Sequence, residues 1–207
     1  MRFFWRSKVR PGAASAAALR ETFIGLQRET QPDLFVEVGA YDAATSVQMR
    51  RSLPRSRIVA FEANPFNYKR FAKARGLKKG DVEFVLSAVA DNSEQRTFTV
   101  LGDGKRANKR SSLLGRSGTG HSYVHVDVPC TSLDEFFRGS SHRHAALWID
   151  VEGAAREVLT GAQRFLPTVQ SLLIEVEEES VWQGQWLKRD VETLSSRGGL
   201  PANRSGL

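Results

Sequence analysis

Cysteine is almost absent from this sequence, which has one such residue, Cys130, among its 207. A single thiol cannot form a disulfide within the chain or build a cysteine-based metal cluster. His121 and His125 show no metal-ligand spacing with other side chains. We therefore expect no resident metal, and a reducing, cytoplasmic setting fits this composition best.

Long hydrophobic runs are also lacking. The candidate nearest the start of the sequence, Ala13–Leu19, is mostly alanine and is closed by Arg20. A cleaved signal peptide needs a more apolar segment, and a transmembrane helix needs about 20 consecutive apolar residues. The sequence therefore predicts neither of them.

Acidic residues are fewer than basic residues. The chain has 30 Lys and Arg against 23 Asp and Glu, which gives a formal net charge of +7. Such an excess often accompanies anionic partners. Because the arginines are spread along the chain, we interpret the excess as a basic surface, and the segment Arg2–Arg10 is the only hint of a nucleic-acid contact.

Short apolar segments alternate with segments of helical periodicity. This alternation predicts an α/β fold with a Rossmann-like, doubly wound, mostly parallel sheet. We expect a basic arm over residues 1–12, one domain over residues 13–196 and an irregular tail over residues 197–207. The expected buried strands are Leu34–Val38, Arg57–Phe61, Val82–Ala90, Ala146–Val151 and Ser171–Val176.

The C-terminal end of the predicted sheet is unusual. Folds of this kind usually add two more strands there, as an antiparallel edge. Residues 197–207 are too few and too rich in glycine, proline and serine to form them. We therefore expect these edge strands to be lacking and the edge beside Ser171–Val176 to be exposed.

Acidic residues and a glycine gather where the predicted strands end. In parallel sheets of this kind, ligands lie outside the carboxyl ends of the strands. Gly39 follows the first of these strands, and a glycine there permits close approach of backbone. Glu62 ends the second, where an acid can accept the hydroxyls of a ribose, and Asp150 ends a later one. A nucleotide cofactor is therefore indicated.

The glycine pattern of dinucleotide sites, G-x-G-x-x-G, is missing. Only Gly39 is present, and Tyr41 and Ala44 occupy the later positions. S-adenosylmethionine has no phosphate and carries a sulfonium and an ammonium, so nearby acids favour it. Glu37, Asp42 and Asp150 are placed to supply that charge.

Four segments in register resemble the FkbM-type methyltransferases, over about residues 30–180. They are Phe35–Ala40 (FVEVGA), Ala60–Pro65 (AFEANP), Val128–Asp134 (VPCTSLD) and Leu147–Gly153 (LWIDVEG). The resemblance implies a Rossmann-like enzyme that depends on S-adenosylmethionine and methylates hydroxyl groups of sugars, polyketides or other small polar acceptors.

The resemblance also implies that Glu37, Gly39 and Glu62 bind the cofactor and that Asp150 and Glu152 border the methyl-transfer site. Further cofactor contacts are expected at the same strand ends: Ala40, Tyr41, Asp42, Ala63, Ser87 and Ala88. The first motif of the family usually reads D-V-G-A-N-x-G. Here Glu37 replaces the aspartate, Tyr41 the asparagine and Ala43 the second glycine. A methyl group at Ala43, where the backbone of the family runs close to the cofactor, would weaken binding.

Transfer to a hydroxyl gains from a base that accepts the proton as the new bond forms. Asp150 and Glu152 are the catalytic candidates; in a strand they would alternate faces, and we favour Asp150. The segment Lys105–His121 lies between the third predicted strand and the Asp150 strand, so it could cover a small-molecule or glycan acceptor. Its basic residues would suit an acidic acceptor, or it is a solvated loop.

Other readings of these residues remain open. Glu37 could cap a helix, Glu62 could be a helix N-terminal charge, and Asp150 and Glu152 could be structural acids. Two alternative functions remain as well: an RNA or protein methyltransferase, suggested by the charge, and a non-catalytic remnant of the fold, suggested by Ala43. Sequence alone assigns neither the acceptor nor the oligomeric state.

Overall fold

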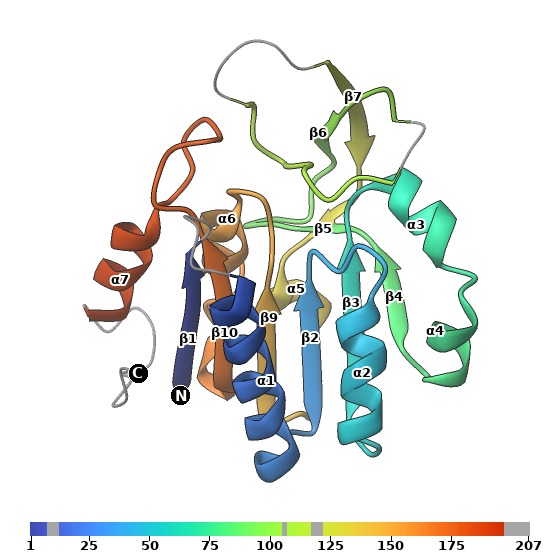
Figure 1. Cartoon of the computed structure of the whole chain (residues 1–207), viewed down its shortest axis with the longest axis vertical. Coiled ribbons are helices and arrows are strands. Elements are labelled where there is room, and N and C mark those ends of the chain that lie inside the picture. Colours follow the sequence, from blue (N-terminus) through green and yellow to red (C-terminus); the bar gives the residue numbers. More distant parts are fainter. Residues whose placement is uncertain (8–12, 105–106, 117–121, 197–207) are drawn as a thin grey trace.

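The structure is a computed structural model, and it describes residues 1–7, 13–104, 107–116 and 122–196. Its centre is a six-stranded, fully parallel sheet with the order β1-β10-β9-β2-β3-β4 (Figure 1). The strands are β1 (Arg2–Ser7), β2 (Leu34–Val38), β3 (Arg57–Glu62), β4 (Glu83–Leu86), β9 (Ala145–Ile149) and β10 (Val169–Val176). The predicted mostly parallel α/β sheet is confirmed.

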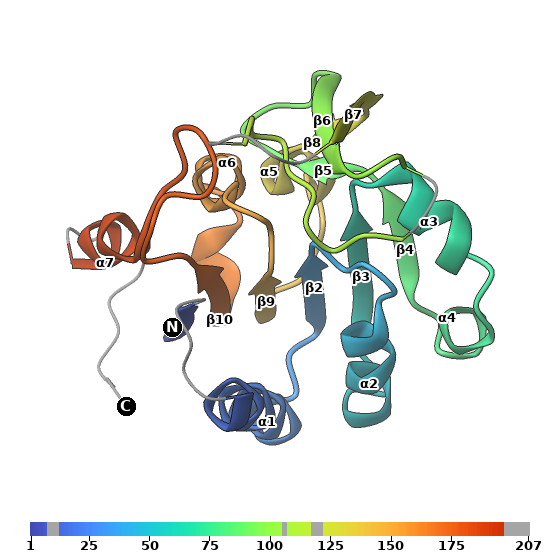
Figure 2. The same ribbon diagram turned by 45° about the horizontal axis from the view of Figure 1, so that its top comes forward.

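Helices cover both faces of this sheet. On one face lie α1 (Ala13–Thr30) and α2 (Ala44–Ser52); on the other lie α5 (Leu133–Phe136) and α6 (Ala155–Thr160) (Figures 1 and 2). Strand residues alternate between the two layers, as a pleated strand requires. In β2, Val36 packs with the α6 layer, whereas Phe35 packs with Phe23 of α1. The core is therefore two apolar layers, one on each side of the sheet.

The remaining elements flank the sheet or follow its carboxyl edge. Beside β4 lie α3 (Pro65–Phe71) and α4 (Arg75–Lys79), and beyond β10 lies α7 (Lys188–Ser196). A 3₁₀ turn spans Leu166–Thr168. Two small sheets stand above the carboxyl edge: the parallel pair β5 (Ala88–Val89) with β8 (Cys130–Thr131), and the antiparallel pair β6 (Arg96–Leu101) with β7 (Tyr123–Val128).

The start of the chain differs from expectation. The sequence predicted a basic arm over residues 1–12 and an exposed edge beside Ser171–Val176, but Arg2–Ser7 form β1 and pair in parallel with that strand. The physical reason is the short aromatic run between Arg2 and Arg6. Phe3 packs toward one layer of the core and Phe4 toward the other, so each sheet face gains an aromatic ring. The edge is therefore covered rather than exposed.

Two further expectations concern the third predicted strand and the C-terminal end of the sheet. The strand predicted over Val82–Ala90 is divided at Ser87 into β4 and β5, which belong to different sheets. Within the described ranges the main sheet contains no antiparallel strand, and the predicted tail over residues 197–207 lies outside those ranges. In the same part of the chain, no helix combines the length and apolarity needed to cross a membrane.

Candidate functional site

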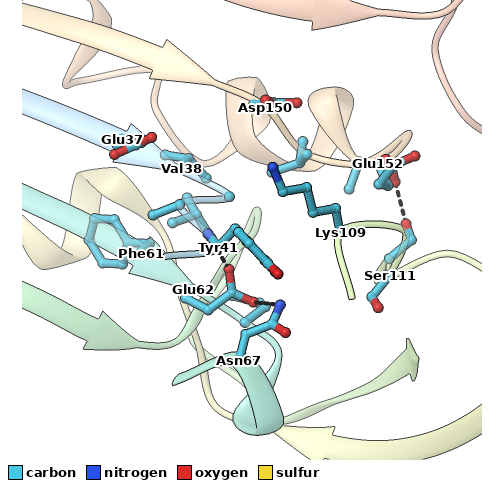
Figure 3. Close-up of a pocket in the computed structure, with 18 of the residues that line it drawn as sticks. Glu37, Val38, Tyr41, Phe61, Glu62, Asn67, Lys109, Ser111, Asp150 and Glu152 are labelled. Atoms are coloured by element: carbon cyan, nitrogen blue, oxygen red, sulfur yellow. Dashed lines mark hydrogen bonds between the residues drawn. The ribbon is translucent and has the colours of Figure 1, made fainter. Parts of the chain in front are cut away.

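A cavity of about 450 Å³ opens at the carboxyl edge of the sheet, where β2, β3 and β9 end (Figure 3). All eleven residues that the sequence predicted for the site line it. They are Glu37, Gly39, Ala40, Tyr41, Asp42, Glu62, Ala63, Ser87, Ala88, Asp150 and Glu152. Residues drawn from four separate stretches of the chain thus meet in one space.

The turn between β2 and α2 forms one wall of this cavity. Three of its residues have left-handed backbone: Gly39, Tyr41 and Ala43, with φ of 87°, 54° and 54°. A Cβ atom at Gly39 would lie 2.1 Å from the carbonyl oxygen of Asp150. Only glycine fits there, because it combines a positive φ with the absence of a side chain. The glycine therefore permits close approach of the neighbouring β9 backbone.

Glu62 stands at the end of β3 and is the best-anchored acid of the site. Its Oε2 accepts a hydrogen bond from the Tyr41 backbone N–H at 2.6 Å. Its Oε1 accepts one from the Asn64 N–H at 2.8 Å and another from the Asn67 side-chain amide at 3.1 Å. A carboxylate offers about four acceptor positions, so about one remains toward the cavity.

Burial gives Glu62 unusual acid–base behaviour. Desolvation raises the pKa of this carboxyl from 4.5 to about 7, with a further increase from the charge of Asp42, while its three hydrogen bonds act in the opposite direction. A positive charge bound in the cavity would favour the ionised form. The ionised carboxylate of Glu62 would therefore stabilise a cationic ligand in this site.

Glu37 has a structural task as well as a place in the cavity wall. Its Oε2 accepts hydrogen bonds from the backbone N–H of Ser46 at 3.0 Å and from the Ser46 hydroxyl at 2.5 Å. Ser46 lies in the first turn of α2, whose N-cap residue, Ala43, has no side-chain oxygen. Glu37 thus serves as the cap of α2, which is the alternative that the sequence left open for it. Burial raises its pKa to about 7 as well.

Ala43 lies away from the cavity. Its methyl group is fully buried in a small cluster with Ala40, Ala60 and Leu77, and Ala43 is not among the lining residues. The expectation that this methyl group meets the cofactor is therefore wrong. The left-handed backbone of Ala43 is energetically unfavourable for a residue other than glycine.

Asp150 and Glu152 follow β9 on the far side of the cavity from Glu62 (Figure 3). The Asp150 N–H donates to the carbonyl oxygen of Val38 at 2.9 Å, and the Ser112 hydroxyl donates to the carbonyl oxygen of Glu152. Because β9 ends at Ile149, the alternation expected of a strand does not apply, and both acids line the cavity.

The loop after β6 covers the cavity, as the sequence suggested for Lys105–His121. Of that segment the structure describes residues 107–116. Asn108 is tied to α3 by two reciprocal bonds: its N–H donates to the Asn67 Oδ1 at 2.9 Å, and the Asn67 amide donates to its carbonyl at 2.8 Å. The Lys109 ammonium lies 4.7 Å from the centre of the Tyr41 ring. The loop is therefore part of the site.

Sequence reasoning assigned no role to Arg20, Asn67 and Glu175, which are polar residues of the cavity wall. Asn67 joins Glu62 to the loop, Arg20 of α1 donates to the Thr45 hydroxyl at 3.4 Å, and Glu175 of β10 is 3% exposed. The sequence already places Glu175 at this edge, because its strand ends there with the others. Asn67 and Arg20 sit on helices without a motif, so only the folded chain reveals them.

Comparison with known proteins gives one family match. A model of the methyltransferase FkbM domain matches residues 37–199 of this chain. A search of curated proteins found no match. Among solved structures, the chain is similar to precorrin-6y C5,15-methyltransferase from Geobacter metallireducens GS-15, with 17% identity and a TM-score of 0.44 over 95% of this chain and 77% of that one.

Proposed function

Because the chain belongs to the methyltransferase FkbM domain family, we propose that it transfers a methyl group from S-adenosylmethionine to a hydroxyl oxygen of a sugar, polyketide or other small polar acceptor. One observation carries the proposal. A single cavity joins the buried carboxyl of Glu62 on one side with Asp150 on the other. That arrangement suits a cationic, ribose-bearing donor next to an acceptor that must lose a proton.

The residues of the cavity fit the donor. Glu62 keeps about one acceptor position for a ribose hydroxyl after its three internal hydrogen bonds. Glu37, Asp42 and Asp150 supply negative charge for an ammonium and a sulfonium, and Ala63, Ser87 and Ala88 would border the adenine. When bound, S-adenosylmethionine would supply an electrophilic methyl carbon together with its leaving group, a sulfonium that becomes a neutral thioether.

The chain's own contribution to the reaction is alignment and proton removal. The loop carrying Asn108 and Lys109 closes the cavity from above and limits access of water, while the acids below fix the acceptor. Asp150 accepts the hydroxyl proton as the acceptor oxygen forms its new bond to carbon. Glu152 then serves as a contact to the acceptor.

The test replaces Asp150 by asparagine. Transfer of a tritiated methyl group to pooled glycans and polyketides should fall by about 10²–10⁴-fold, because the proton has no acceptor, whereas donor binding should persist. Asp127→Asn, an exposed acid outside the cavity wall, is the matched control and should retain most of the activity. Unchanged turnover in the Asp150→Asn variant would contradict the proposed role.

A further inference from the structure

The flank formed by α3 and α4 carries a dense block of positive charge. Between Asn64 and Gly80 the sequence has six basic residues and no acidic one. They are Lys69, Arg70, Lys73, Arg75, Lys78 and Lys79, and all six are exposed. We name these six residues the α3–α4 basic face. In two views the two helices follow one another beside β4, with α3 near its carboxyl end and α4 near its amino end (Figures 1 and 2).

The fold does not neutralise this face. Over the residues that the structure describes, none of the six basic side chains forms an ion pair with an acid. The next acids along the chain are Asp81 and Glu83, and Glu83 pairs with Arg57 at 2.8 Å. Lys69 and Arg70 lie in the last turn of α3, and Lys78 and Lys79 in the last turn of α4, where positive charge is favourable. Six like charges on one flank also repel each other. An anionic ligand would relieve that repulsion.

The α3–α4 basic face is continuous with the mouth of the cavity. Asn67 of α3 bonds reciprocally to Asn108, and the next two residues of the loop are the exposed cations Lys109 and Arg110. The Lys109 side chain extends from the loop into the cavity beside Tyr41 (Figure 3). Positive charge therefore runs from α4 across α3 to the place where an acceptor would enter.

The aromatic rings near this face distinguish between a nucleic acid and a chain of acidic sugars as the bound polyanion. Proteins that bind single-stranded nucleic acid offer free rings on which bases stack. Here the rings are already paired: Tyr41 lies 5.0 Å from Phe71, and Tyr68 stacks on Phe84 at 5.0 Å. The face therefore offers charge without a stacking platform. A chain of acidic sugars needs only charge, and each of its units carries hydroxyl groups.

We propose that the α3–α4 basic face binds an acidic polysaccharide, a chain of uronic acid sugars, and leads it past Lys109 so that one of its hydroxyls enters the cavity. This inference rests on the proposed function and names the class of its acceptor. The carboxylates of the sugar chain would lie along α4 and α3, while the acids of the cavity remain for the cationic donor.

Binding of fluorescein-labelled oligogalacturonate, followed by fluorescence anisotropy, tests the proposal. Wild-type protein should bind it with an affinity that falls steeply with salt, and should not bind labelled neutral dextran. The variant Lys69→Gln/Lys73→Gln/Lys78→Gln should bind about tenfold more weakly, because it removes three of the six charges that would pair with the carboxylates.

The matched control, Arg143→Gln/Arg156→Gln/Arg189→Gln, loses the same charge at three exposed positions outside α3 and α4, before β9, in α6 and in α7. It should bind like the wild type. Equal weakening in both variants, no binding to oligogalacturonate, or tighter binding of a single-stranded RNA of equal charge would each overturn the proposal. The measurement contains no methyl donor, so its outcome is independent of whether the Asp150 experiment succeeds.

Discussion

Ala43 stands at the amino end of α2, where a side-chain oxygen usually caps a helix, and it has none to offer. The carboxylate of Glu37 accepts the Ser46 N–H in its place, and the Asp42 carboxylate accepts the N–H of Ala44 at 3.0 Å. Glu37 therefore couples the end of β2 to the start of α2. Any ligand that contacts Glu37 also contacts the cap of this helix.

The substitution Ala43→Gly tests whether the Ala43 methyl group contacts the donor or only packs in the core. It relieves about 1–2 kcal/mol of left-handed strain but loses about 1 kcal/mol of methyl burial and some rigidity of the unfolded chain. We expect the free energy of unfolding in urea to change by less than about 1 kcal/mol, with unchanged affinity for S-adenosylmethionine in calorimetry.

Ala43→Val is the contrasting variant. A β-branched residue in left-handed backbone, within a closed apolar cluster, should destabilise the protein by about 1–3 kcal/mol. A large gain of donor affinity in Ala43→Gly would mean that the methyl group meets the donor, against its place in the core.

At the scale of elements, the strands made of buried apolar runs could be predicted from the sequence. The strand β1, a short run between two arginines, could not. β2 was predicted with its observed bounds, and β3 to within one residue. β1 was missed because only three apolar residues lie between Arg2 and Arg6, and this short run is stabilised by its neighbour β10 rather than by its own pattern.

The same limit applies to the site. Residues at strand ends could be located, because parallel strands bring their carboxyl ends to one edge. A capping role for Glu37 was among the alternatives that the sequence left open, but the link from Asn67 to Asn108 depends on segments that meet only after folding. Sequence spacing therefore predicts the residues of the cavity wall, but not the hydrogen bonds that hold the loop after β6 over the cavity.

Phe4→Ala tests whether β1 belongs to the core. The Phe4 ring makes an edge contact with Phe23 at 5.7 Å, and Phe23 makes another with Trp148 at 5.5 Å. Since Phe4 is only half-buried, the loss should be about 1–3 kcal/mol in urea unfolding, and Phe4→Leu should lose less than about 1.5 kcal/mol. A change within about 0.5 kcal/mol for Phe4→Ala would contradict the pairing of β1 with β10.

At the scale of the whole molecule, buried acids make stability depend on pH. Glu37 and Glu62 have pKa values of about 7 in the folded state, against an ordinary 4.5. Between these values the folded protein holds protons that the unfolded chain has lost. Stability from these two groups is therefore full below pH 4.5 and is lost as the pH rises to about 7. The lowered pKa of His142, due to its burial, acts in the opposite direction.

The double variant Glu37→Gln/Glu62→Gln isolates this effect. Between pH 5 and pH 8 the ligand-free wild type should lose more free energy of unfolding than the double variant, with a difference on the order of a few kcal/mol. Urea unfolding at several pH values measures it, and His142 contributes equally to both proteins. Equal losses in the two proteins would show that the two carboxyls stay ionised over this pH range, against the raised pKa values.

The central claim is that this cavity holds S-adenosylmethionine through Glu62, and calorimetric titration of the donor tests it most directly. We predict one-to-one binding to the wild type that is tighter at pH 8 than at pH 6, because the ionised Glu62 with its pKa of about 7 favours a cation. Glu62→Gln should bind about 10–100-fold more weakly, as the loss of a charged hydrogen-bond partner predicts, while the exposed Glu83→Gln should be unchanged. No heat of binding at millimolar donor, or equal affinity in Glu62→Gln and the wild type, would contradict the account.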